Sequence, residues 1–191
     1  MYSKTLLIFY GFLLAEVNSI AVPDDPSCAV GNTKTTKDCC VVPKVVDPVL
    51  KARCKAENPL DPNEVKTDGC CVARCSMINL NVFQNNIIDK AAAKRALRAT
   101  VGADPQFAPI TNRIIDACAN KVNMDASLRV PPISAATGVE GCSLRPELFI
   151  DCVSLQMFQQ CPASALTKDA GCDALMAKAN SGKCYFETLE G

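Results

Sequence analysis

Histidine and tryptophan are both missing from this chain of 191 residues. Without histidine, the chain cannot build a Ser-His-Asp or Cys-His catalytic site, a mixed Cys/His zinc finger or a histidine-ligated haem. Aromatic residues make up only 5% of the chain, which leaves few side chains to stack on single-stranded nucleic acid. Twenty basic residues balance twenty acidic ones, so no net charge favours nucleic acid or an anionic membrane as a partner.

The chain also lacks an apolar run long enough to span a membrane. The run from Thr5 to Ala15 falls well short of the ~20 residues that a spanning helix needs, and no later stretch qualifies. Lys4 precedes this run and small residues follow it at Ser19 and Ala21, which is the pattern of a secretory signal peptide. We therefore expect a signal peptide over residues 1–21, cleaved after Ser19 or Ala21, and a single secreted domain over residues 22–191.

Cysteine is the residue that the chain has in excess, with thirteen, all of them beyond Ser27. In an oxidising compartment thiols pair, so disulfides are favoured over metal ligands, and we expect neither a metal nor a cofactor. No Cys-x-x-Cys pair is present to indicate a redox site. Thirteen is odd, so six disulfides leave one thiol over. Consecutive cysteines point apart, and each member of Cys39-Cys40 and of Cys70-Cys71 is expected to reach a different segment.

The spacing of apolar residues predicts helices and almost no strand. In the second expected helix, which begins at Asp68, a buried stripe is predicted to contain Cys71, Cys75 and Ile78. Residues 23–46 and the tail from residue 182 have no helical period, and we expect them to be irregular arms held by cysteines. The prediction is an all-α, disulfide-stapled bundle of about six helices, which span residues 47–58, a segment from 68, 83–100, 107–122, 144–160 and a segment from 172 to 182.

The intervals between cysteines are specific. Three residues separate Cys71 from Cys75, forty-two separate Cys75 from Cys118, and eight separate Cys152 from Cys161. This spacing resembles that of the insect odorant-binding proteins, which are small secreted helical carriers of hydrophobic molecules. The additional cysteines and the Cys161-Pro162 dipeptide resemble the Plus-C subgroup of that family, and the resemblance covers about residues 54–172.

The resemblance implies three interlocked disulfides, Cys54–Cys75, Cys71–Cys152 and Cys118–Cys161. The choice of Cys71 over Cys70 rests only on the three-residue interval to Cys75. Spacing leaves open how the remaining seven cysteines pair, namely Cys28, Cys39, Cys40, Cys70, Cys142, Cys172 and Cys184.

The resemblance also implies an apolar cavity inside the bundle, a small hydrophobic ligand and no enzymatic activity. Phenylalanine offers a flat apolar wall and methionine adapts to several ligand shapes, so these residues and their apolar neighbours are the candidate ligand contacts. Further expected partners are a membrane chemoreceptor or a second copy of the chain, but not nucleic acid. The candidate ligand contacts are Met77, Leu80, Phe83, Ile87, Phe107, Ile114, Met124, Phe149, Val153, Met157 and Phe158.

Other functions have weaker support in the sequence. Glu147 and Asp151 lie one helical turn apart, but on a predicted polar face, where ionised carboxylates are the ordinary case. A basic patch around Lys90 and Lys94 is interpreted as a solvated helix face. The alternative function is a secreted, disulfide-rich interaction module, such as a protease inhibitor or effector, that acts through its surface. A hollow apolar interior would distinguish the carrier from this module.

Overall fold

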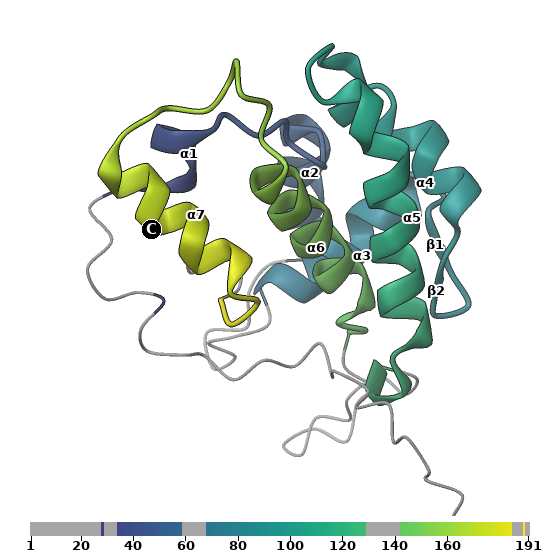
Figure 1. The fold of residues 1–191 in the computed structure, drawn as a ribbon. Helices are drawn as coiled ribbons and strands as arrows, with labels where there is room; N and C mark the ends of the chain where they lie inside the picture. The colour runs from purple at the N-terminus through teal and green to yellow at the C-terminus, as the bar shows by residue number, and fades with distance from the viewer. Residues whose placement is uncertain (1–27, 29–33, 59–67, 129–141, 185–188, 190–191) are drawn as a thin grey trace, which may run out of the picture.

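The computed structural model describes residues 28, 34–58, 68–128, 142–184 and 189. Within these ranges the regular secondary structure is almost all helix (Figure 1). The expected signal peptide lies outside the described residues. No helix in the described ranges is long and apolar enough to cross a membrane. The elements in chain order are α1 (Thr36–Cys39), α2 (Pro48–Glu57), α3 (Asp68–Asn79), β1 (Phe83–Gln84), β2 (Ile87–Ile88), α4 (Lys90–Leu97), η1 (Val101–Ala103), α5 (Ala108–Met124), η2 (Ala126–Leu128), α6 (Arg145–Gln159) and α7 (Ala170–Asn180).

Helix α6 occupies the centre of the bundle and packs against α3, α5 and α7 (Figure 1). Its residues Phe149, Val153 and Met157 are fully buried at a spacing of four, as the sequence predicts. Helix α2 packs on α3, α4 packs on α5, and the short α1 lies against α7. The predicted all-α fold is confirmed.

Residues 83–88 form a small antiparallel hairpin rather than the start of a helix. Phe83 pairs with Ile88, and Gln84 pairs with Ile87. The two turn residues, Asn85 and Asn86, have φ angles of 51° and 57°, in the left-handed region that asparagine adopts more readily than most residues. The prediction of a single helix over residues 83–100 is therefore wrong in its first part, because the chemistry of the Asn-Asn turn prevails over the apolar period.

Helix α4 begins after this hairpin because two side chains fix the end of the second strand. Asp89 caps the helix by accepting a hydrogen bond from the backbone N–H of Ala92 at 2.9 Å. Asn123 of α5 accepts a hydrogen bond from the backbone N–H of Ile88 and donates one to its carbonyl, at 2.9 and 2.8 Å. A side chain 35 positions away thus holds the strand in its extended conformation. The local spacing of apolar residues carries no information about such a distant contact.

Helix α3 buries a different face from the one predicted. Ile78 is 46% exposed, and Cys71 and Cys75 are only half-buried. The buried stripe instead contains Cys70, Ala73 and Met77, at the equally helical spacing of i, i+3 and i+7. Both stripes are consistent with a helix, and the packing of α3 on α6 selects between them.

Six disulfides join the described cysteines, and Cys71 belongs to none of them. The predicted Cys54–Cys75 bond is confirmed. As predicted, Cys39 and Cys40 reach different segments. The six are Cys28–Cys184, Cys39–Cys172, Cys40–Cys161, Cys54–Cys75, Cys70–Cys142 and Cys118–Cys152.

The two other pairings implied by the resemblance, Cys71–Cys152 and Cys118–Cys161, are wrong. Helices α5 and α6 pack side by side and bring the Cα atoms of Cys118 and Cys152 to 5.7 Å, within bonding range. Cys161 bonds instead to Cys40, in a segment that the implied pattern left out. On α3 it is Cys70, on the buried face, that forms a disulfide, with Cys142.

The N-terminal arm, defined as residues 34–47, is fastened to the C-terminal third of the chain. It contains the short helix α1, which the sequence does not predict. Besides the disulfides of Cys39 and Cys40, the backbone N–H of Thr167 donates to the carbonyl of Cys39 at 2.8 Å, and Cys40 forms an isolated bridge with Leu166. The arm is therefore part of the folded unit.

Two methionines test how far burial decides stability. Met157 has no solvent exposure, whereas Met124 is 78% exposed. We expect Met157→Ala to lower the free energy of unfolding by about 2–5 kcal/mol through lost contacts and a cavity. Met124→Ala should change it by less than about 0.5 kcal/mol. Urea unfolding followed by circular dichroism measures both values, and similar values for the two variants would contradict the packing described here.

Candidate functional site

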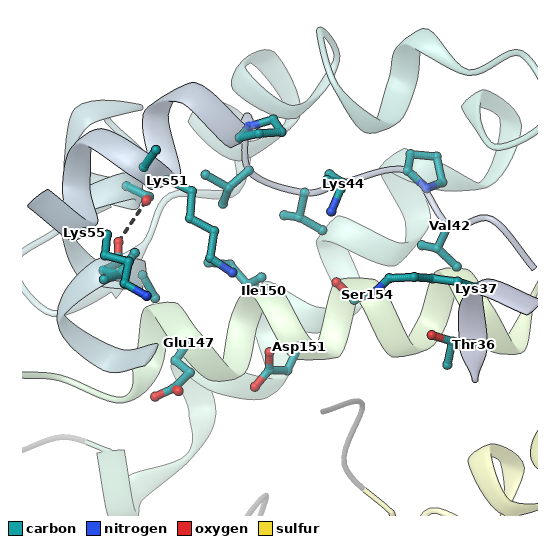
Figure 2. Close-up of a pocket in the computed structure, with 18 of the residues that line it drawn as sticks. Thr36, Lys37, Val42, Lys44, Lys51, Lys55, Glu147, Ile150, Asp151 and Ser154 are labelled. Atoms are coloured by element: carbon teal, nitrogen blue, oxygen red, sulfur yellow. Dashed lines mark hydrogen bonds between the residues drawn. The ribbon is translucent and has the colours of Figure 1, made fainter. Parts of the chain in front are cut away.

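A pocket of about 650 Å³ lies between the N-terminal arm, α2, α3 and α6 (Figure 2). Its apolar lining comes mainly from valines. Val45 and Val46 of the arm and Val72 of α3 are buried, and Ile150 of α6 is half-buried. The protein's own packing covers most of these buried valines, and the apolar surface that is open to the pocket comes from Val41, Val42 and Ile150.

Charged side chains line the same pocket. Glu147, Asp151 and Ser154 lie in a row along α6, and Lys51 and Lys55 extend from α2 toward that helix (Figure 2). The arm contributes two more lysines, so the lining contains four ammonium groups and two carboxylates. The four lysines are exposed and the two carboxylates half-buried, which gives the lining a net positive charge at its solvent edge. The lysines are Lys37, Lys44, Lys51 and Lys55.

Local sequence places the charges on the pocket side of α2. Asp47 caps this helix by accepting hydrogen bonds from the backbone N–H groups of Val49 and Leu50 at 2.8 and 3.1 Å, with Pro48 at the first helical position. Once the start of the helix is fixed, Lys51 and Lys55 lie four positions apart and therefore share a face of the helix.

The arm is held in place by charged contacts as well as by disulfides. The backbone N–H and the hydroxyl of Thr35 donate hydrogen bonds to Asp38, and these bonds lower the pKa of the Asp38 carboxyl below its ordinary value of 3.8. Asp169 accepts a hydrogen bond from the backbone N–H of Cys172 and pairs with Lys34 at 3.2 Å. These two contacts lower the pKa of Asp169.

None of the eleven predicted ligand contacts lines this pocket. Leu80 is half-buried, whereas Ile87 and Met124 are 54% and 78% exposed. The other eight are buried in the core, namely Met77, Phe83, Phe107, Ile114, Phe149, Val153, Met157 and Phe158. A preference for large flexible or aromatic side chains selects residues of the packed core and not the valines of the arm. The sequence signal for this pocket is the group of four valines within residues 41–46, directly after two adjacent cysteines.

Two other features of the sequence are explained by packing. Lys94 pairs with Asp116 at 2.6 Å and Lys90 donates to Asn120 at 3.0 Å, so two lysines of the basic patch bind the neighbouring α5. The carboxylate of Glu57 lies within 4.8 Å of the sulfurs of Cys54 and Cys75, but these sulfurs form a disulfide and cannot act as thiolate ligands for a metal.

The sequence model of a protein family described as AgamOBP47-like matches residues 43–178, more than two thirds of the chain. The chain belongs to this family of insect odorant-binding proteins. Membership confirms the resemblance seen in the cysteine spacing, and thirteen cysteines are compatible with the Plus-C subgroup.

Three odorant-binding proteins of Anopheles gambiae are similar to this family member over most of its length. General odorant-binding protein 67 is 28% identical over 169 residues, which cover 83% of this chain and 79% of the relative. Odorant-binding protein 47 is 29% identical over 164 residues, with coverage of 80% and 70%. General odorant-binding protein 68 is 23% identical over 177 residues, with coverage of 90% and 81%.

The matched range includes most of the pocket of this odorant-binding protein. Residues 43–178 contain the pocket-lining parts of α2, α3 and α6 and the second half of the arm. Residues 36–42, which complete the arm side of the pocket, precede the matched range.

The disulfide between Cys40 and Cys161 should hold the arm side of the pocket closed. We expect the double variant Cys40→Ala/Cys161→Ala to remain helical but to exchange the amide hydrogens of residues 36–48 at least tenfold faster, because one covalent anchor of the arm is lost. The matched control, Cys70→Ala/Cys142→Ala, removes a disulfide that does not involve the arm. Hydrogen exchange read by mass spectrometry measures both, and equal protection of residues 36–48 in the two variants would refute this role.

Proposed function

We propose that this odorant-binding protein is a secreted, non-enzymatic carrier of small hydrophobic molecules that binds them in the pocket between the arm, α2, α3 and α6. The observation that carries the proposal is a preformed pocket with an apolar wall in a member of this family. Its volume of about 650 Å³ lies in the range of ~300–1,000 Å³ typical of small-molecule sites. Residues 1–21 are proposed to direct secretion as a cleaved signal peptide.

Binding would be driven by removing the apolar surface of the ligand from water, at roughly 25 cal/mol per Å². Val45 and Val46 are fixed by the packing of the protein itself, so binding requires little new ordering of this side of the pocket. A pocket of this kind supports the carrier over a surface-acting inhibitor or effector, which needs no hollow.

The carboxylates of the pocket do not by themselves support an enzyme. The chain has no histidine to act as a general base, and a hydrolytic role would depend on Glu147 and Asp151 alone. Beside four lysines, these carboxylates are better explained as part of a charged lining that is mixed in sign. A membrane chemoreceptor or a second copy of the chain is proposed as a further partner.

Because the chain has no tryptophan, a single introduced tryptophan can report on the pocket. Ala52 and Ala56 are both exposed residues of α2, but only Ala52 lines the pocket. We expect dodecanol to change the tryptophan emission of the Ala52→Trp variant with a Kd on the order of micromolar. The Ala56→Trp variant should show no change in emission.

A displacement assay with a fluorescent apolar probe on the unmodified protein is the control for this titration. If dodecanol displaces the probe while the emission of the Ala52→Trp variant stays constant, the ligand binds elsewhere, for example among Phe149 and Met157. If the folded protein binds neither probe nor dodecanol, the carrier function itself is wrong.

We expect the affinity for dodecanol to change less than about threefold between pH 7.5 and 5.5, or less than ~0.7 kcal/mol. No histidine is present to titrate in this interval. Asp169 pairs with Lys34 of the arm, and its lowered pKa means that this contribution to holding the arm is complete above the ordinary pKa of 3.8 and is lost only as pH falls through the lower folded value. The lowered pKa of Asp38 has the same consequence for its hydrogen bonds with Thr35 inside the arm. Titration of the Ala52→Trp variant at several pH values measures this, and a steep loss of affinity near pH 6 would contradict it.

A further inference from the structure

We propose that the pocket prefers amphiphiles that have one alkyl chain and one anionic head group, such as medium-chain and long-chain alkyl carboxylates. In this arrangement the alkyl chain contacts the valine wall and the head group is held by lysines at the solvent edge. The inference rests on the proposed function, because it names the ligand class of the same pocket.

Three lysines carry the argument. Lys37, Lys44 and Lys51 line the pocket, are exposed, and make no ion pair with any residue in the described part of the chain. By contrast, Lys94 on α4 and Lys34 at the start of the arm both pair with aspartates. The pocket therefore presents ammonium groups whose charge no described side chain neutralises in an ion pair.

The lining of the pocket changes from apolar and buried on its inner side to charged and exposed at its edge. Val45 and Val46 are 3% and 8% exposed, whereas the neighbouring Lys44 is exposed. An alkyl chain gains free energy where its surface leaves water against the apolar lining, and an ionised head group loses least hydration free energy if it stays in partial contact with water. A ligand with an apolar chain and one charged end matches this gradient better than a wholly apolar molecule of the same length.

The sign of the head group follows from where the charges lie. Glu147 and Asp151 are on the α6 side of the pocket (Figure 2), and both already make an interaction within the protein. The three lysines come from the arm and α2, on the other side. An anionic head group would be attracted to the lysines and repelled from α6. A cationic one would meet carboxylates that are already engaged and would face three ammonium groups.

Three ligands with the same twelve-carbon chain test the preference at pH 7.5, namely dodecanoate, dodecanol and dodecyltrimethylammonium. We expect dodecanoate to bind at least tenfold more tightly than dodecanol, and dodecyltrimethylammonium to bind most weakly. The advantage of dodecanoate should shrink as the ionic strength rises from about 0.02 M to about 0.5 M, because exposed charges are screened. Equal binding of dodecanoate and dodecanol, or tightest binding of the cation, would overturn the inference.

Two triple variants, each of which removes three lysine charges, test whether these lysines cause the preference for dodecanoate. Lys37→Gln/Lys44→Gln/Lys51→Gln should reduce the advantage of dodecanoate over dodecanol to within about threefold. The control is Lys121→Gln/Lys168→Gln/Lys183→Gln, which removes three exposed lysines outside the pocket lining and should keep the full advantage. If the pocket variant keeps the tenfold advantage, the lysines do not hold the head group.

The dodecanol titration distinguishes a wrong ligand class from a wrong carrier function. If the Ala52→Trp variant reports dodecanol binding but the protein shows no preference for dodecanoate, the pocket is a carrier site and only the ligand class is wrong. If the protein binds neither dodecanol nor dodecanoate, the proposed function fails as well.

Discussion

The pocket depends on the covalent attachment of the N-terminal arm to the C-terminal third of the chain. Cys39 and Cys40 are adjacent, yet they bond to Cys172 and Cys161. These disulfides close loops of more than 100 residues, and the chain-entropy argument gives each about 5 kcal/mol before the other cross-links reduce it. The arm is only fourteen residues long, from residue 34 to residue 47. Held in this way, it can serve as a wall without first building a core.

Helix α6 connects the core with the pocket, because one of its faces is buried in the core and another lines the pocket. Phe149, Val153 and Met157 pack against the rest of the bundle, while Ile150 and Asp151 line the pocket. The rigid core side fixes the position of the pocket side, since both belong to one helix. This pocket therefore lies beside the core formed by Phe149, Val153 and Met157.

The mixed lining of the pocket bears on selectivity. Valine side chains alone would accept any apolar molecule of suitable volume, because apolar contact is not directional. Lysines at the edge and carboxylates on α6 would add electrostatic contributions to the binding free energy, and these depend on the sign and position of the charge on a ligand. Selectivity can then differ between related chains through exposed residues that do not contribute to folding, so it can change without loss of stability.

The amino-acid sequence by itself determined the helical class, the positions of the five longest helices, and the family. Local spacing carries this information: Phe149, Val153 and Met157 recur once per turn, and the intervals around Cys75 are characteristic. Only the tertiary structure decided which of two stripes α3 buries, that Cys118 meets Cys152, and that residues 83–88 form a hairpin held by Asn123. It also placed the pocket among arm valines rather than among core phenylalanines. The physical reason is that periodicity identifies a buried face, whereas disulfide partners and hollows depend on segments that approach one another from distant parts of the chain.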